Sequence, residues 1–213
     1  MNHLFNGPKD PKVILILAHG SGAGMDTEFM TNIAEGISES DISVMRFEFP
    51  YMAKTRKTGK RSPPNSARVL IETYRKIIST IADGIPVFIG GKSMGGRIAS
   101  MIADSEEVHG CICLGYPFHP PGKPTQLRTA HLEHINTPIC IVQGTRDPFG
   151  TKAQVSEYSL SANINITWLE NGDHSFKTRK KDRQTHTDLI KKSINVCQTF
   201  IHNTLNNSVP LLD

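Results

Sequence analysis

Three polar residues with the chemistry of a nucleophile, an acid and a base each follow an apolar run of their own. Ser93 lies in GGKSMGG, which contains the pattern GxSxG between an apolar run and a helical pattern. Asp147 follows the run PICIV, and His174 follows NITWLE. A serine hydroxyl attacks well only when a base takes its proton, and a carboxylate orients that base. The residue types and their order predict a catalytic triad of Ser93, Asp147 and His174.

The glycine-rich segment has two alternative interpretations. A phosphate-binding loop of the form GxxxxGK[ST] would end on its lysine and hydroxyl residue, whereas Lys92 and Ser93 come too early. A dinucleotide-binding pattern fails because the glycines have the wrong offsets. A plain strand-to-helix turn stays open as the alternative. For a nucleophile, Gly91 and Gly95 would make room for a strained turn.

A hydrolase that forms a tetrahedral intermediate also needs donors for the oxyanion. We expect one donor to be the backbone N–H of Met94, beside the nucleophile at the start of a helix. The segment HGSGAG (19–24) follows the run VILILA and predicts the second donor, the backbone N–H of Ser21. His19 is expected to shape this loop rather than to act as the base.

Basic side chains gather in two segments, residues 54–61 and 177–183. The first segment follows the run ISVMRFEF, so we expect a loop at the same edge of the sheet as the triad. These side chains either are solvated, as charge runs usually are, or attract an anionic substrate. The candidates for such contacts are Lys54, Arg56, Lys57, Lys60 and Arg61, with Lys92 and Arg146 as competing anion contacts.

The overall composition is that of an ordinary globular chain. Of 213 residues, 38% are hydrophobic and 21% are charged, with a formal net charge of +4. This charge is too small to indicate nucleic-acid binding, and no apolar run approaches the length of a membrane span. The N-terminal MNHLFNGPKDPK lacks the apolar region of a secretory signal. We therefore expect a cytoplasmic protein with neither nucleic acid nor a membrane as its partner.

Candidate metal ligands are sparse. The cysteines have neither a zinc-site nor a CxxC spacing, and are expected to be buried, reduced thiols: Cys111, Cys113, Cys140 and Cys197. The segment HLEH offers His131 and His134 without an evident third ligand. The sequence predicts no metal and no cofactor.

Six apolar runs must position the candidate residues. They predict strands at VILILA (13–18), ISVMRFEF (42–49), IPVFIG (85–90), CICLG (111–115), PICIVQG (138–144) and NITWLE (165–170). Helical patterns alternate with them, which favours one α/β domain over residues 1–213, with a core at about 13–203. Its sheet should be mostly parallel, with about six strands and helices on both faces. Ligands of such sheets bind beyond the carboxyl ends of the strands, where all three triad candidates fall.

Four segments resemble a small α/β-hydrolase of the group related to dienelactone hydrolase: HGSGAGMD (19–26), GGKSMGGR (90–97), GTRDPFG (144–150) and GDHSF (172–176). The chain looks closest to a subfamily that includes a testis-expressed protein and a chromatin acetyltransferase-complex subunit. Ser93 departs from dienelactone hydrolase, which carries a cysteine nucleophile. The run VILILA leads directly into the loop at 19–24, so no antiparallel opening strand is expected. The short segment between CICLG and PICIV predicts no large lid.

The resulting prediction is a serine hydrolase that cleaves an ester or thioester of a small soluble acyl compound, with an anionic compound as one alternative. The competing hypothesis is a binding or scaffold module of the same fold with an idle triad. The resemblance to a chromatin-complex subunit and the basic segment 54–61 motivate that second hypothesis.

Overall fold

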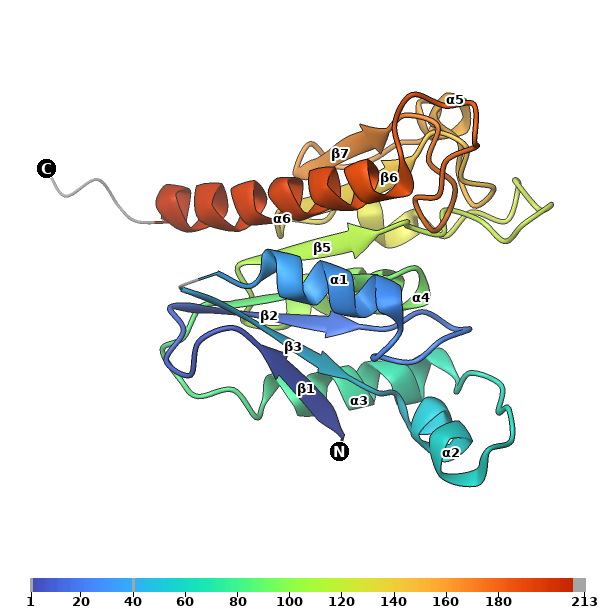
Figure 1. Ribbon diagram of the computed structural model, residues 1–213. Coiled ribbons are helices and arrows are strands. Elements are labelled where there is room, and N and C mark those ends of the chain that lie inside the picture. Colours follow the sequence, from blue (N-terminus) through green and yellow to red (C-terminus); the bar gives the residue numbers. More distant parts are fainter. Residues whose placement is uncertain (1, 40, 209–213) are drawn as a thin grey trace, which may run out of the picture.

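The computed structural model describes residues 2–39 and 41–208, and its centre is a seven-stranded sheet between two layers of helices (Figure 1). The strand order is β1-β3-β2-β4-β5-β6-β7. The strands are β1 (His3–Asn6), β2 (Val13–Ala18), β3 (Ile42–Phe47), β4 (Val87–Lys92), β5 (Gly110–Leu114), β6 (Ile139–Gly144) and β7 (Ile164–Leu169). Neighbours from β3 to β7 are parallel, and β1 is antiparallel to β3. The predicted single-domain, mostly parallel α/β fold is confirmed.

Strand β1 corrects the prediction of about six strands and no antiparallel opening strand. Its four residues, HLFN, pair with β3 at the edge of the sheet, with Leu4 opposite Arg46. Three of the four residues are exposed, so the segment lacks the apolar pattern by which strands are found. A guanidinium nitrogen of Arg46 donates to Asn6 Oδ1 at 2.9 Å and ties β1 to β3.

The helices cover both faces of the sheet (Figure 1). They are α1 (Glu28–Ile37), α2 (Pro50–Thr58), α3 (Ala67–Ile78), α4 (Met94–Ile102), α5 (Lys152–Val155) and α6 (His186–Ser208). Alternate side chains of each strand point to opposite faces. Accordingly, Leu15 of β2 packs in the cluster that contains α1 and α6, whereas Ile16 packs in the cluster that contains α3 and α4. The sheet is therefore buried on both sides, and its carboxyl edge is left to the loops.

The basic segment expected as a loop forms helix α2 over much of its length. Pro50 stands at its first turn, where a missing N–H costs nothing, and Gly59 ends it in the left-handed conformation with φ 67°. Tyr51 is the buried residue of this helix. Because α2 has so few apolar positions, it lacks the apolar stripe along one side by which the other helices are recognised in the sequence.

Two connections complete the frame around the carboxyl edge. Residues 115–138, between β5 and β6, contain a single short 3₁₀ turn at Ala130–Leu132, in agreement with the prediction of no large lid. Between β6 and β7 the chain forms only the single helical turn α5. Its N-cap Thr151 forms a capping box with Gln154.

All four cysteines are buried and free of disulfides. Within residues 2–39 and 41–208, none of the helices combines the length and the apolar character that crossing a membrane would require.

Candidate active site

Ser93 stands on a sharp turn between β4 and α4. Its φ and ψ angles are 52° and −113°, a conformation that residues other than glycine rarely adopt. A Cβ atom at Gly91 or at Gly95 would lie only 2.5 Å from the carbonyl oxygen of Ala18. Glycine is therefore required two residues before and two residues after Ser93, because β2 packs directly against the turn. The strain is of the kind that functional sites store.

The structure brings the three predicted triad residues together at the carboxyl edge of the sheet. The Nε2 atom of His174 lies 2.9 Å from Ser93 Oγ, and its Nδ1 atom lies 2.7 Å from Asp147 Oδ2. A carboxylate only accepts hydrogen bonds, so Nδ1 carries the proton and Nε2 is free to accept from the serine hydroxyl. The three residues follow β4, β6 and β7, which are near one another in the sheet.

Asp147 is fully buried, and its carboxylate has several donors. Besides His174, the backbone N–H of Phe149 donates to Oδ1 at 2.9 Å, and the Nε2 group of Gln143 donates to Oδ2 at 3.0 Å. The Oε1 atom of Gln143 accepts from the backbone N–H of Tyr116 at 2.7 Å. Gln143 therefore fixes the carboxylate that orients His174. The sequence analysis missed this role, although an amide inside the apolar run ICIVQG was a visible signal.

The environment of His174 favours the neutral imidazole. Burial lowers its pKa below the usual 6.5, and the nearby Lys92 charge lowers it further, while the hydrogen bond to Asp147 acts in the opposite direction. The Phe149 ring lies against the imidazole, with centroids 4.2 Å apart and planes inclined by 33°. A neutral His174 at pH 7 is in the state that accepts a proton.

The loop after β2 is held with its carbonyl groups turned toward internal donors. His19 is fully buried, and its Nε2 accepts from the backbone N–H of Phe49 at 3.1 Å. Its Nδ1–H therefore donates to the Gly20 oxygen at 2.7 Å. The Tyr51 hydroxyl lies 3.1 Å from both the Gly20 and Ser21 oxygens. Both ring nitrogens of His19 are therefore used to hold the loop, as the sequence analysis expected. The same loop carries Ser21, whose backbone N–H is the predicted oxyanion donor.

Met94 is the first residue of α4. The first four N–H groups of a helix have no partner within it, so the Met94 N–H is available beside Ser93. The helix dipole also favours negative charge at this position.

Two hollows meet at Ser93. One, of about 300 Å³, is lined by Ser21 and Ser93 together with Arg97 of α4 and Arg128 of the β5–β6 connection. The other, of about 340 Å³, is bordered by the loop after β2, by Phe29, and by His174. Phe149 contributes to both hollows. Arg97 and Arg128 were not among the predicted site residues.

Residues 11–202 match the family model described as an alpha/beta hydrolase domain. The chain belongs to this family. A serine hydrolase homologue from Coxiella burnetii is similar in structure, with 18% identity and a TM-score of 0.72, over 92% of this chain and 90% of that one.

Two further solved structures resemble this α/β-hydrolase. A serine hydrolase without a lid from Xanthomonas campestris has 16% identity and a TM-score of 0.64, over 99% of this chain and 90% of that one. A dienelactone hydrolase from Anabaena variabilis has 17% identity and a TM-score of 0.66, over 92% and 88% of the two chains. At these identities the likeness shows the fold.

Lys92 and Arg146, predicted as anion contacts, hold the His174 loop of the hydrolase instead. The Lys92 ammonium donates to the His174 carbonyl oxygen at 2.6 Å. Arg146 donates to the carbonyl oxygens of Asn171 and Lys177 at 2.9 and 3.2 Å. Both cations are thus occupied by main-chain oxygens of the loop that carries the imidazole.

The predicted substrate contacts on α2 do not border the two hollows at Ser93. Arg56 binds the carboxylates of Glu48 and Asp26, with nitrogen–oxygen distances of 2.5 and 2.8 Å. Asp26 lies directly before Thr27, the N-cap of α1. Lys54 and Lys57 are exposed on α2. Among the described residues that line the two hollows at Ser93, none comes from α2.

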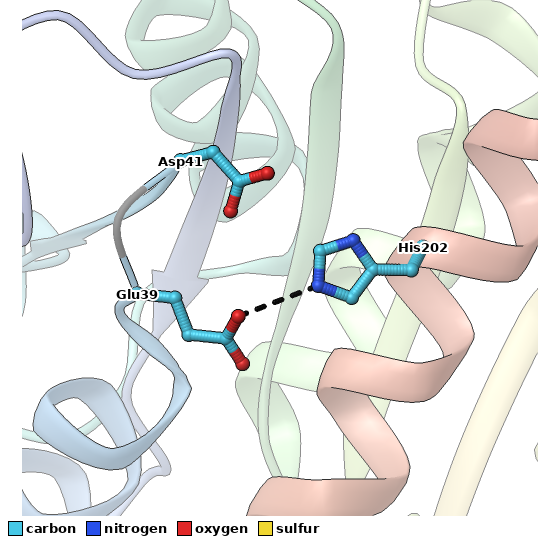
Figure 2. Close-up of side chains that lie close together, drawn as sticks. All are labelled: Glu39, Asp41 and His202. Atoms are coloured by element: carbon cyan, nitrogen blue, oxygen red, sulfur yellow. Dashed lines mark ion pairs between the residues drawn. The ribbon is translucent and has the colours of Figure 1, made fainter.

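One group of potential metal ligands occurs among the described residues, at the opposite edge of the sheet. Figure 2 shows Glu39, Asp41 and His202, whose ligand atoms lie within 4.8 Å of one another. Glu39 and His202 form a long ion pair of 3.5 Å, and their side chains are 36% and 39% exposed. In the segment HLEH, His131 instead lies 2.9 Å from Ser100 Oγ.

Proposed function

We propose that this α/β-hydrolase is a serine hydrolase that cleaves an ester or thioester of a small soluble acyl compound. The observation that carries the proposal is the continuous hydrogen-bonded chain from Ser93 Oγ through His174 to the buried Asp147. The strained turn that presents Ser93 and the helix N-terminus beside it add independent support.

In the acylation step, Ser93 Oγ forms a bond to the substrate carbonyl carbon while its proton passes to His174 Nε2. The carbonyl π electrons move to the oxygen, which becomes an oxyanion held by the backbone N–H groups of Ser21 and Met94. Asp147 stabilises the imidazolium and keeps its orientation. When the intermediate collapses, the bond to the leaving oxygen or sulfur breaks, and the leaving group takes the proton from His174.

Deacylation repeats these steps with water as the nucleophile. His174 takes a proton from the water as its oxygen bonds to the acyl carbon, and then returns that proton to Ser93 Oγ. The two open hollows give the acyl and leaving portions separate directions away from Ser93. No lid needs to move before a soluble substrate enters.

The alternative is a scaffold module of this fold with an idle triad. The sequence resemblance to a testis-expressed protein and a chromatin acetyltransferase-complex subunit motivates it. Against it stand the aligned hydrogen bonds and the burial of Asp147, because an unused carboxylate would be costly to keep buried.

Labelling with a fluorophosphonate probe tests the proposal. Wild-type protein should be labelled and should hydrolyse p-nitrophenyl acetate, whereas Ser93→Ala should lose both properties. Ser156→Ala is the matched control, because Ser156 is exposed and its hydroxyl bonds only to the local Ala153 carbonyl oxygen. Equal labelling of wild type and Ser93→Ala, or inertness of folded wild type toward probe and esters, would overturn it.

A further inference from the structure

The smaller hollow at Ser93 contains two arginines that differ from the others around the site. Arg97 follows Ser93 by four residues, so it lies one helical turn along α4 on the same side. Arg128 comes from the β5–β6 connection and borders the same hollow. Both are half-buried. The hollow therefore joins the proposed nucleophile to two guanidinium groups.

Neither guanidinium is neutralised. Among the described residues, no carboxylate forms an ion pair with Arg97 or Arg128, and the Arg97 Nε atom is buried without a hydrogen-bond partner. By contrast, Arg56 and Arg75 bind carboxylates, and Arg146 binds main-chain carbonyls. A protein gains nothing for folding from placing unpaired cations together in a cavity.

The polar neighbours of this pair supply no negative charge. Burial, together with the charge of Arg97, lowers the pKa of Arg128 and lowers that of the neighbouring His131 to about 4. His131 is therefore neutral at pH 7. The remaining polar neighbour in the hollow, Asn65, donates or accepts hydrogen bonds without charge.

We propose that Arg97 and Arg128 bind a carboxylate at the non-reacting end of the substrate. This inference rests on the proposed hydrolase function and narrows its substrate class to esters or thioesters that carry a second, free carboxyl group. A guanidinium presents a planar fork of donors that matches a carboxylate, which explains arginine rather than lysine at both positions.

Arg97 and Arg128 replace the basic residues of segment 54–61 as the proposed anion contacts. The lysines of α2 were expected to attract an anion, but they do not line either hollow, and Arg56 is held by Glu48 and Asp26. Arg97 and Arg128 border the nucleophile itself. They therefore select the substrate in the bound state rather than by long-range attraction.

Matched pairs of esters give the test. Phenyl hydrogen adipate carries its carboxylate on the acyl side, and 4-acetoxybenzoate carries it on the leaving side. The twin of each replaces the carboxylate by a primary carboxamide, which has the same shape without the charge. For at least one pair, wild-type kcat/KM should favour the carboxylate more than about 10-fold.

Substitution of either arginine should remove this preference. Arg97→Gln and Arg128→Gln should lower the carboxylate-to-carboxamide ratio of kcat/KM about 10- to 100-fold, the range of a charge-assisted hydrogen bond. Arg97→Lys should restore part of it. Arg75→Gln is the control, because it removes one positive charge from a partly exposed pair with Glu106 away from the hollow. An active wild type without the preference, an unchanged ratio in both variants, or a stronger preference for a phosphate analogue would overturn the proposal.

A binding readout separates this proposal from the hydrolase function. Adipate or 4-hydroxybenzoate should raise the Tm of Ser93→Ala protein, and Arg97→Gln added to that background should abolish the shift. A shift that survives in the double variant would contradict the pocket. If no ester is cleaved and Ser93 is not labelled while the shift is present and depends on Arg97, the hydrolase function fails and the carboxylate site stands.

Discussion

The Lys92 ammonium donates a 2.6 Å hydrogen bond to the main-chain oxygen of His174, behind the imidazole that faces Ser93. The ammonium also lies 5.6 and 5.8 Å from the ring centroids of Phe29 and Phe176. Burial in these surroundings lowers the Lys92 pKa from 10.5 to about 8. Lys92 is therefore a positioning residue for the base, charged at pH 7 and electrostatically coupled to it.

Lys92→Met should move the acid limb of the kcat/KM profile to higher pH. The positive charge of Lys92 lowers the His174 pKa, so removing the charge raises it, and more alkaline solution is needed to reach the neutral base. We also expect kcat to fall roughly 10-fold. The loop that carries His174 loses its hydrogen bond to Lys92, so the imidazole is held less firmly against Ser93. The measurement is kcat/KM from pH 4 to 9.

Lys54→Met is the control for this shift, because Lys54 is an exposed lysine on α2. Its acid limb should coincide with that of wild type. Equal limbs for Lys92→Met and wild type would disprove the electrostatic coupling between Lys92 and His174.

Gln143→Glu should damage both stability and activity more than Gln143→Met. The glutamine donates to Asp147 Oδ2 and accepts from the Tyr116 N–H. Methionine leaves both groups without this partner, at a cost of about 2–4 kcal/mol for two buried polar groups. Glutamate keeps the acceptor for Tyr116 but sets a second carboxylate against Asp147. Urea unfolding and kcat measure the two effects.

Gln126→Glu provides the matched change at an exposed position. It should leave the free energy of unfolding and kcat within experimental error. If Gln143→Glu behaved like Gln126→Glu, Gln143 would have no role in holding Asp147.

The sequence was sufficient for the parts of the fold that are marked by apolar runs. The six predicted strands all occur. Strands β2, β3, β5 and β6 are buried along their whole length, whereas the edge strand β7 is buried only at Leu169. Strand β1 and helix α2 were missed for the same physical reason. Each contacts the core along too few positions to leave a periodic pattern, and tertiary pairing with β3 or a single buried Tyr51 stabilises it instead.

The same distinction applies to the site. Ser93, Asp147 and His174 were predictable because parallel strands bring their carboxyl ends to one edge. The carboxylate preference proposed for Arg97 and Arg128 depends on a different observation. Within residues 2–39 and 41–208, neither arginine forms an ion pair with a carboxylate. Only the packed structure distinguishes these arginines from Arg56, which has two carboxylate partners.

Gly95→Ala should destabilise the protein although it replaces a helical glycine. Alanine normally stabilises a helix by about 1 kcal/mol relative to glycine. Here its Cβ would lie 2.5 Å from the Ala18 oxygen and 2.7 Å from the His19 oxygen, both parts of the backbone. We expect a loss of about 3 kcal/mol or more, with displacement of the loop that carries Ser21. Thermal unfolding and labelling of Ser93 measure the two effects.

Gly22→Ala serves as the comparison, since a Cβ at Gly22 meets nothing within 4 Å. It should retain wild-type stability. A Gly95→Ala protein as stable as Gly22→Ala would show that the turn at Ser93 does not depend on close contact with β2.

Arg56→Gln should reduce stability rather than substrate affinity. The Glu48 side chain is fully buried, and Arg56 neutralises it while also binding Asp26 of the loop after β2. Loss of the cation would leave the Glu48 charge buried and unpaired. The expected cost is about 2 kcal/mol, less than for a fully buried pair because the Arg56 side chain is 42% exposed.

Glu48→Gln added to Arg56→Gln should recover part of the loss, because it removes the unpaired charge. Lys57→Gln, an equal change of charge on the same helix, should leave the urea midpoint unaltered. If Arg56→Gln instead raised KM only for anionic esters at unchanged stability, Arg56 would be a substrate contact after all.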